Sequence, residues 1–205
     1  MHDLIDVEVL AGVSGIEGHS GLSVEDTVLH LGIAGATRPK VICEVGFNAG
    51  HSMATWLAAS NICEVKIYAF DLGNHNYYRA AAALFKALLS PGQFEMIIGD
   101  SRNTLPQFYQ KLGGRKCDLF HVDGGHLPGI PQSDAEFAAK LTNPGGIVIV
   151  DDTPCGESHC VEPRRAFDAH VKNGDFVNPI TVFITKIGHG ISFAHVAGDD
   201  ENAKS

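Results

Sequence analysis

The sequence has no long hydrophobic run, no excess of positive charge and no cysteine pairs at the spacing that binds zinc. A membrane-spanning helix needs roughly 20 consecutive apolar residues, so we expect a soluble protein with no membrane partner. The formal net charge of −9 at pH 7 argues against a nucleic-acid partner, because phosphate backbones are bound by basic surfaces. The expected partner is therefore a small molecule.

The five cysteines are an odd number, which favours reduced thiols in the cytoplasm over a disulfide framework. The N-terminus carries acidic residues and lacks the compact apolar core of a secretory signal peptide, which also favours a cytoplasmic location. Cys155 and Cys160 are the closest pair in the sequence. We expect ordinary thiols there, with metal binding or regulation as the alternative.

Five short runs rich in β-branched and aromatic residues are each followed by a segment with a helical pattern. The strand-like runs are residues 40–46, 65–71, 94–100, 117–123 and 146–152. Near-continuously apolar strands that alternate with helices indicate a mostly parallel sheet with helices on both faces. The predicted fold class is therefore α/β, with a Rossmann-like, doubly wound sheet.

The C-terminal part of the chain breaks this alternation. Residues 179–187 and 190–197 are both strand-like, with no helix between them, which predicts a hairpin whose last strand is antiparallel to the rest of the sheet. We predict a main domain over residues 25–198, an N-terminal segment (1–24) without a clear place in the core, and a frayed tail (199–205). A homo-oligomer in which the N-terminal segment packs against a second subunit is left open.

An acidic residue stands at the end of each predicted parallel strand. In an open α/β sheet, ligands bind outside the carboxyl ends of the strands. A single aspartate there is often a helix cap or a turn residue, but five acidic strand ends together indicate a binding site. The residues are Glu44, Asp71, Asp100, Asp123 and the pair Asp151 and Asp152.

The stretch EVGFNAGHS, residues 44–52, joins the first strand to the next helix. Gly46 and Gly50 leave room for a ligand close to the backbone, and the N–H groups of the helix start, with the Ser52 hydroxyl, suit an anionic group. The alternative is a tight turn that merely requires glycine. The spacing matches neither G-x-G-x-x-G nor G-x-x-x-x-G-K-[ST], which counts against dinucleotides and nucleoside triphosphates.

These elements, in this order, resemble the class I S-adenosylmethionine-dependent methyltransferases. The motifs that carry the resemblance are E-x-G-x-x-x-G-x-S in EVGFNAGHS, YAFD at the second strand, GDS after the third, HVDGGH after the fourth and NPGGIVIVDD at the fifth. The resemblance covers roughly residues 25–196 and is closest to the branch of catechol O-methyltransferase-like and macrocin O-methyltransferase-like enzymes. It implies S-adenosylmethionine as the cofactor and a small hydroxylated molecule as the substrate.

The resemblance also implies which residues bind the cofactor. Asp71 would accept hydrogen bonds from the two ribose hydroxyls, a task that suits a carboxylate at a strand end. Asp100 and Ser101 would lie along the adenine. The residues that would surround the methionine portion are Glu44, Gly46, Asn48, Gly50 and Ser52.

Asp123, Asp151 and Asp152 place three carboxylates at neighbouring strand ends. They would repel one another if all were ionised, so either one stays protonated or a cation lies among them. Oxygen ligands favour Mg²⁺, Ca²⁺ or Mn²⁺ over zinc, and we expect Mg²⁺. The resemblance implies the same three ligands. Asp replaces the Asn of the catechol-type enzymes in the pair after the fifth strand, which points away from catechol itself as the substrate.

His126 follows Asp123 by three residues, where the catechol-type enzymes place a lysine that helps to deprotonate the substrate hydroxyl. A histidine that titrates near neutral pH could take this proton or bind the metal, and the structural alternative is a capping histidine. We therefore name His126 and Asp123 as the catalytic candidates. His121, inside a strand, is expected to be a buried structural histidine, whereas His159 and Cys155 could reach the substrate.

Two other functions remain open at this point. A non-catalytic cofactor-binding or scaffolding protein could use the same fold, although the full acidic set argues against it. A nicotinamide-dependent oxidoreductase would share the sheet, but the sequence lacks the G-x-G-x-x-G turn. The sequence does not identify the methyl acceptor.

Overall fold

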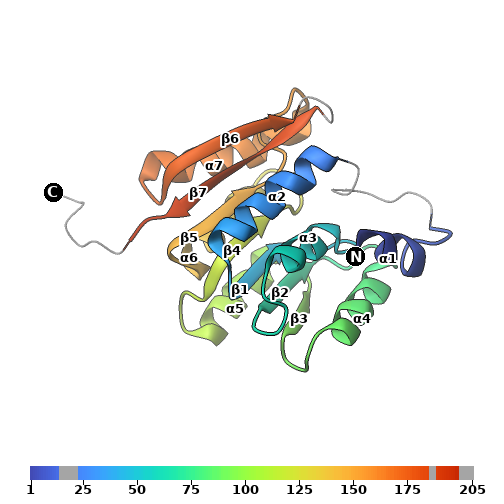
Figure 1. Cartoon of the computed structure of the whole chain (residues 1–205). Coiled ribbons are helices and arrows are strands. Elements are labelled where there is room, and N and C mark those ends of the chain that lie inside the picture. Colours follow the sequence, from blue (N-terminus) through green and yellow to red (C-terminus); the bar gives the residue numbers. More distant parts are fainter. Residues whose placement is uncertain (14–22, 185–187, 199–205) are drawn as a thin grey trace.

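The computed structural model describes residues 1–13, 23–184 and 188–198, which form a seven-stranded sheet with helices on both faces (Figure 1). The strand order is β3-β2-β1-β4-β5-β7-β6. The strands are β1 (Val41–Val45), β2 (Lys66–Asp71), β3 (Phe94–Ile98), β4 (Cys117–Val122), β5 (Thr142–Val150), β6 (Phe176–Ile184) and β7 (His189–Val196).

The pairing of the strands confirms the predicted fold class. β1 to β5 pair with one another in the parallel sense, and β7 pairs in the antiparallel sense with both β5 and β6. The chain changes direction across the sheet at β1, because β2 lies on one side of it and β4 on the other. The loops that follow β1 and β4 therefore leave the carboxyl edge of the sheet in different directions. In such folds, ligands bind in the crevice at this edge.

The helices divide between the two faces of the sheet. Buried residues of α1 to α4 share one hydrophobic cluster, and those of α5 to α7 share the other. The helices are α1 (His2–Glu8), α2 (Val24–Thr37), α3 (His51–Ala59), α4 (Tyr78–Leu88), α5 (Ser101–Leu112), α6 (Ile130–Leu141) and α7 (Val161–Asn173), with a short 3₁₀ helix, η2 (Ser158–Cys160). Among the described residues, none of these helices combines the length and apolarity needed to cross a membrane.

The N-terminal helix α1 belongs to the core, so the expectation that the first residues have no place there is wrong. Ile5 and Val9, one helical turn apart, are buried in the same cluster as α3. The Asp6 carboxylate lies 2.9 Å from His51 Nε2 on α3. The buried residues are mixed with exposed apolar ones such as Leu4 and Val7, which makes the periodic signal weak and is why sequence reasoning missed them. The predicted frayed tail lies outside the described residues, as do residues 185–187 of the predicted hairpin.

The cysteines also differ from the expectation of reduced thiols, which is wrong for four of the five. Cys43 of β1 is bonded to Cys117 of β4, and Cys155 is bonded to Cys160, while Cys63 is free and exposed. Pairing of β1 with β4 brings the first two together although 74 residues separate them, a closeness that spacing rules cannot reveal. The argument from thiols to a cytoplasmic location therefore loses its support.

Candidate functional site

A cavity of about 640 Å³ lies at the carboxyl ends of β1 to β4. Its walls are the turn after β1, the strand ends of β2 and β3, and the loop after β4. All but two of the predicted site residues line it: Gly46, Asn48, Gly50, Ser52, Asp71, Asp100, Ser101, Asp123, His126 and Asp152. The two that do not are Glu44 and Asp151.

The two glycines of the turn after β1 are required by protein contacts. Gly46 has a φ of 93°, and a Cβ there would lie 1.8 Å from the backbone oxygen of Asp123. Gly50 has a φ of 84° and would place a Cβ 2.7 Å from the ring of Phe85. These protein contacts account for both glycines, and the predicted close approach of a ligand stays a prediction, since both residues also line the cavity. They let the turn pack against the loop after β4 and set the start of α3 at the cavity wall.

Asp71, at the end of β2, is held rigidly at the cavity. Its Oδ2 accepts a hydrogen bond from the backbone N–H of Asn48 at 2.8 Å, and its Oδ1 accepts one from the N–H of Gly73 at 2.7 Å. Each carboxylate oxygen can accept a second hydrogen bond. The side chain can therefore bind two neighbouring hydroxyl groups of a ligand without moving.

Asp100 caps α5 at the same rim of the cavity. It accepts hydrogen bonds from the backbone N–H and the side chain of Arg102, and the bond to the guanidinium lowers the pKa of Asp100. Arg102 itself lines the cavity. Sequence reasoning missed it, because a basic residue in the first turn of a helix carries no signal of its own.

Asp134, on α6, is a buried carboxyl group that sequence reasoning did not identify. It is 1% exposed, and burial raises its pKa to about 6, while a contact with the hydroxyl of Ser101 acts in the opposite direction. Asp134 also lies against Gly124, whose Cβ would approach its Oδ2 to 3.0 Å. This carboxyl therefore supports the loop after β4 from behind the cavity.

Replacing Asp134 with asparagine should stabilise the protein at high pH only. The carboxyl has a higher pKa in the folded state than its ordinary value of 3.8, so the unfolded chain ionises first and the free energy of unfolding falls as pH rises from about 4 through 6. Asn removes this penalty. We expect a gain of about 1–2 kcal/mol at pH 8 and little change at pH 4, measured by urea unfolding. The exposed Asp168→Asn is the control, and an equal gain at both pH values would contradict the prediction.

Asp123, His126 and Asp152 form the polar part of the cavity floor. His126 Nε2 lies 3.0 Å from Asp152 Oδ2, and one donor atom from each of the three residues lies within 4.8 Å of the other two. Burial and the neighbouring Asp151 carboxylate raise the pKa of Asp123 well above its usual value, and the hydrogen bond to Asp152 raises the pKa of His126. In the absence of a cation, a proton on Asp123 therefore relieves the repulsion between its carboxylate and those of Asp151 and Asp152. This donor set fits a divalent metal ion.

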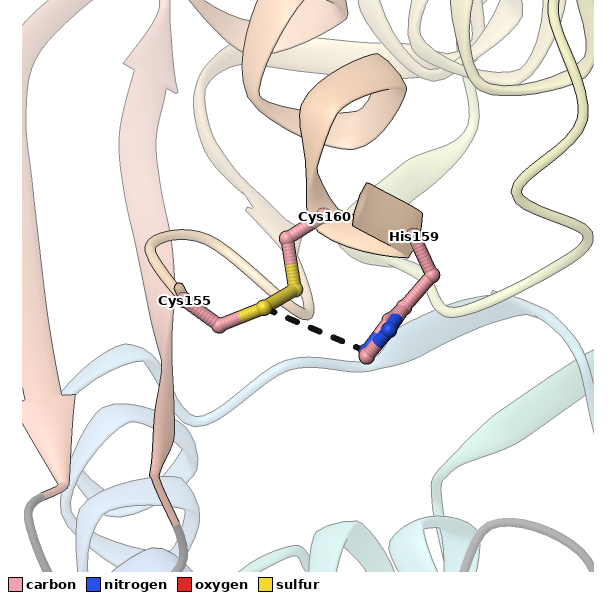
Figure 2. Close-up of side chains that lie close together, drawn as sticks. All are labelled: Cys155, His159 and Cys160. Carbon is pink, nitrogen blue, oxygen red and sulfur yellow. Dashed lines mark hydrogen bonds between the residues drawn. A yellow bond between two sulfur atoms is a disulfide. The ribbon is translucent and has the colours of Figure 1, made fainter. Parts of the chain in front are cut away.

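Two more histidines lie near Asp152. His189 Nδ1 is 3.4 Å and His159 Nε2 is 3.9 Å from Asp152 Oδ1. Figure 2 shows His159 beside the disulfide of Cys155 and Cys160, with its Nε2 3.9 Å from Cys155 Sγ. The disulfide closes the short loop that carries His159. His189 starts β7, far along the chain from Asp152, and no sequence pattern connects the two.

Glu44 lies behind the cavity wall, not at its surface, which corrects its predicted position. Its Oε1 accepts hydrogen bonds from the Ser52 hydroxyl at 2.6 Å, from Trp56 Nε1 at 3.3 Å and from His121 Nδ1 at 2.9 Å. All four side chains are buried. Glu44 therefore positions Ser52 from inside the protein. The expectation that His121 is buried is confirmed.

Asp151 also faces the interior. Its Oδ1 accepts the backbone N–H of Asp152 at 2.8 Å, and its Oδ2 lies 3.8 Å from His121 Nε2. Burial alone would raise the pKa of Asp151, but the neighbouring His121 outweighs this effect and lowers it. The three predicted metal ligands are thus divided, with Asp123 and Asp152 at the cavity and Asp151 behind it.

Comparison with known proteins places this geometry in context. The model of a family described as a methyltransferase domain matches residues 43–153. No curated protein sequence matches the chain significantly.

Three solved structures share the fold. The O-methyltransferase TomG from Streptomyces achromogenes, in complex with S-adenosylmethionine, is 20% identical and has a TM-score of 0.72, with 96% of this chain and 88% of that chain covered. The O-methyltransferase from Bacillus cereus, in complex with S-adenosylhomocysteine, is 16% identical with a TM-score of 0.72, over 95% and 89% of the two chains. The methyltransferase PaMTH1 from Podospora anserina is 18% identical with a TM-score of 0.63, over 86% and 80%.

Proposed function

The chain belongs to the methyltransferase-domain family, and we propose that it is an S-adenosylmethionine-dependent O-methyltransferase that modifies a small hydroxylated molecule with the help of a divalent metal ion. The observation that carries this proposal is one continuous cavity at the carboxyl ends of the strands. It joins Asp71 and the turn after β1, where the cofactor is expected, to Asp123, His126 and Asp152.

The cofactor half of the cavity has the chemistry that this proposal needs. Two backbone N–H groups fix the Asp71 carboxylate for the ribose hydroxyls. The start of α3, with Ser52 in its first turn, provides N–H groups for a carboxylate. S-adenosylmethionine supplies a methyl group on a positively charged sulfur when bound. The chain therefore has to position the acceptor oxygen and remove its proton.

The acceptor half of the cavity contains groups for both tasks. Asp123 and Asp152 would hold the divalent ion, which would lower the pKa of a substrate hydroxyl when bound. We assign the proton to His126 Nδ1, because His126 Nε2 lies 3.0 Å from Asp152 Oδ2 and donates its own hydrogen to that carboxylate. The Asp152 carboxylate orients the imidazole and stabilises the imidazolium that results from proton transfer. A ligand role for His126 is the alternative.

The proposal is tested by separating cofactor binding from metal dependence. We expect wild-type protein to bind S-adenosylhomocysteine in isothermal titration calorimetry both with EDTA and with Mg²⁺. Methyl transfer from radiolabelled S-adenosylmethionine to a panel of phenolic, catecholic and sugar hydroxyls should fall at least about ten-fold in EDTA and recover with Mg²⁺.

The possible negative results of these two experiments contradict different parts of the proposal. No heat with the cofactor product, and no thermal stabilisation by it, would overturn the cofactor assignment. Binding without methyl transfer to any acceptor would favour the non-catalytic cofactor-binding alternative. Transfer that EDTA leaves unchanged would overturn the metal-assisted part of the proposal.

A further inference from the structure

Two histidines and an aspartate from three separate elements meet in the interior behind the cavity. They are His30 of α2, His121 of β4 and Asp151, which follows β5. One donor atom from each lies within 4.8 Å of the other two. His30 is 2% exposed, His121 is 0% exposed and Asp151 is 8% exposed. The cluster is therefore inaccessible to bulk solvent, unlike the residues at the cavity floor.

The hydrogen bonds of the two histidines leave one nitrogen of each ring unpaired. His30 Nδ1 lies 2.9 Å from the backbone oxygen of Asp26, and His121 Nδ1 lies 2.9 Å from Glu44 Oε1. Both partners are acceptors, so in the neutral rings Nδ1 carries the proton and Nε2 carries a lone pair. Both Nε2 atoms are buried and have no hydrogen-bond partner. Two buried orphaned acceptors in one cluster require an explanation.

This arrangement is the one found around metal-binding histidines. Such a histidine donates its second N–H group to a carboxylate or to a backbone carbonyl, which fixes the tautomer and orients the ring. His121 uses the Glu44 carboxylate, and His30 uses the Asp26 carbonyl. The Trp56 ring lies against both imidazoles, with centroid distances of 4.6 Å to His30 and 5.3 Å to His121.

The charges of the cluster also favour a cation. Three buried carboxylates, those of Asp26, Glu44 and Asp151, lie against the two imidazoles, and a divalent ion would offset part of their charge. Burial opposes a proton on His121 Nε2, but Asp151 and Glu44 raise the pKa of His121 well above its usual value, so this proton is the alternative to a metal ion. Asp151 Oδ2 is 3.8 Å away, which is too far for a hydrogen bond, and the proton would leave His30 Nε2 unpaired.

We propose that His30, His121 and Asp151 form a buried binding site for a zinc-type divalent transition ion, separate from the site of Asp123, His126 and Asp152. Imidazole nitrogens select such ions over Mg²⁺, which prefers oxygen ligands and keeps much of its water. The site is enclosed, so the ion has a structural role. It joins α2 to β4 and β5 directly behind the cavity floor.

The test uses the full chain in an Asp152→Asn background, which weakens the cavity site, under non-reducing conditions that preserve the disulfides. After removal of bound metal with a chelator, Zn²⁺ is added in a calorimeter, and Co²⁺ is added while visible absorption is recorded. We expect one Zn²⁺ per chain and Co²⁺ absorption bands typical of nitrogen and oxygen ligands. His30→Leu should reduce Zn²⁺ affinity at least about 100-fold and abolish the Co²⁺ bands.

His195→Gln is the matched control, because His195 also bonds a backbone oxygen through Nδ1 but lies at an exposed position away from the cluster. It should bind Zn²⁺ as the background does. Absence of Zn²⁺ binding in the background, or equal binding in His30→Leu, would overturn the proposal. If circular dichroism shows that His30→Leu does not fold, the Co²⁺ spectrum of the Asp152→Asn protein decides between the outcomes. Bands typical of nitrogen and oxygen ligands would support the proposal, and their absence would overturn it. No step measures methyl transfer, so the result is independent of the proposed function.

Discussion

Replacing Asp71 with alanine is expected to weaken the binding of S-adenosylhomocysteine about a hundred-fold or more in isothermal titration calorimetry. The carboxylate would accept hydrogen bonds from two ribose hydroxyls, and each bond to a charged group contributes about 1.5–3 kcal/mol. A loss of 1.4 kcal/mol is already tenfold in affinity. The substitution also removes the acceptor of the Asn48 and Gly73 N–H groups, so the turn that lines the cavity loses its support.

Asp118→Ala is the control for this effect. Asp118 of β4 accepts hydrogen bonds from the backbone N–H groups of Lys40 and Val41 at the opposite end of β1. Like Asp71, it accepts hydrogen bonds from two backbone N–H groups, but it does not line the cavity. We expect its replacement to lower thermal stability and to leave affinity within about three-fold. Similar losses of affinity in the two variants, or retained binding in Asp71→Ala, would contradict the assignment of the ribose site.

Replacing His121 with alanine is expected to lower the free energy of unfolding by about 3–5 kcal/mol, measured by urea denaturation in EDTA. His121 and Glu44 form a buried pair with 0% exposure on both sides, and removal of one partner leaves a buried charge uncompensated. The loss of the imidazole also leaves a void next to Trp56. This is the largest effect on stability that we expect for a single polar side chain.

A double-mutant cycle distinguishes the buried pair from the void. If the pair dominates, Glu44→Gln should reduce the cost of His121→Ala, because a neutral amide tolerates the loss of its partner better than a carboxylate does. His170→Ala provides a comparison, because His170 pairs with the half-exposed Asp175 at 2.9 Å, and it should cost about 1 kcal/mol or less. If the losses in free energy of unfolding of the two single variants simply add up in the double variant, Glu44 and His121 are not a coupled pair.

The fold was predictable because its signals are local. Each parallel strand is a short apolar run, and each is followed by a helical pattern, so the order of elements alone indicates the sheet. The contributions of α1 and of the Cys43–Cys117 disulfide were not predictable. Both depend on contacts between parts of the chain that are distant in sequence. The local sequence of either part does not indicate which other part it contacts.

The candidate site was predictable where a strand end alone determines the position of a residue. Asp71, Asp123 and Asp152 line the cavity as that rule requires. Glu44 does not, because it lies within β1 and its side chain points to the face covered by α3, so alternation along the strand overrides nearness to the turn. His189 was missed because its place beside Asp152 follows only from the insertion of β7 between β5 and β6.

The position of β7 in the sheet has a consequence for the order of assembly during synthesis. β1, β2 and β3 occupy one half of the sheet and are complete once Ile98 has emerged, so the turn after β1 and Asp71 can be in place early. β5 remains an open edge until β7, which comes after β6 in the chain, pairs with it. A growing chain can therefore shape the cofactor half of the cavity before the acceptor half exists, and a ribosome-bound intermediate would expose β5 to pairing with another chain.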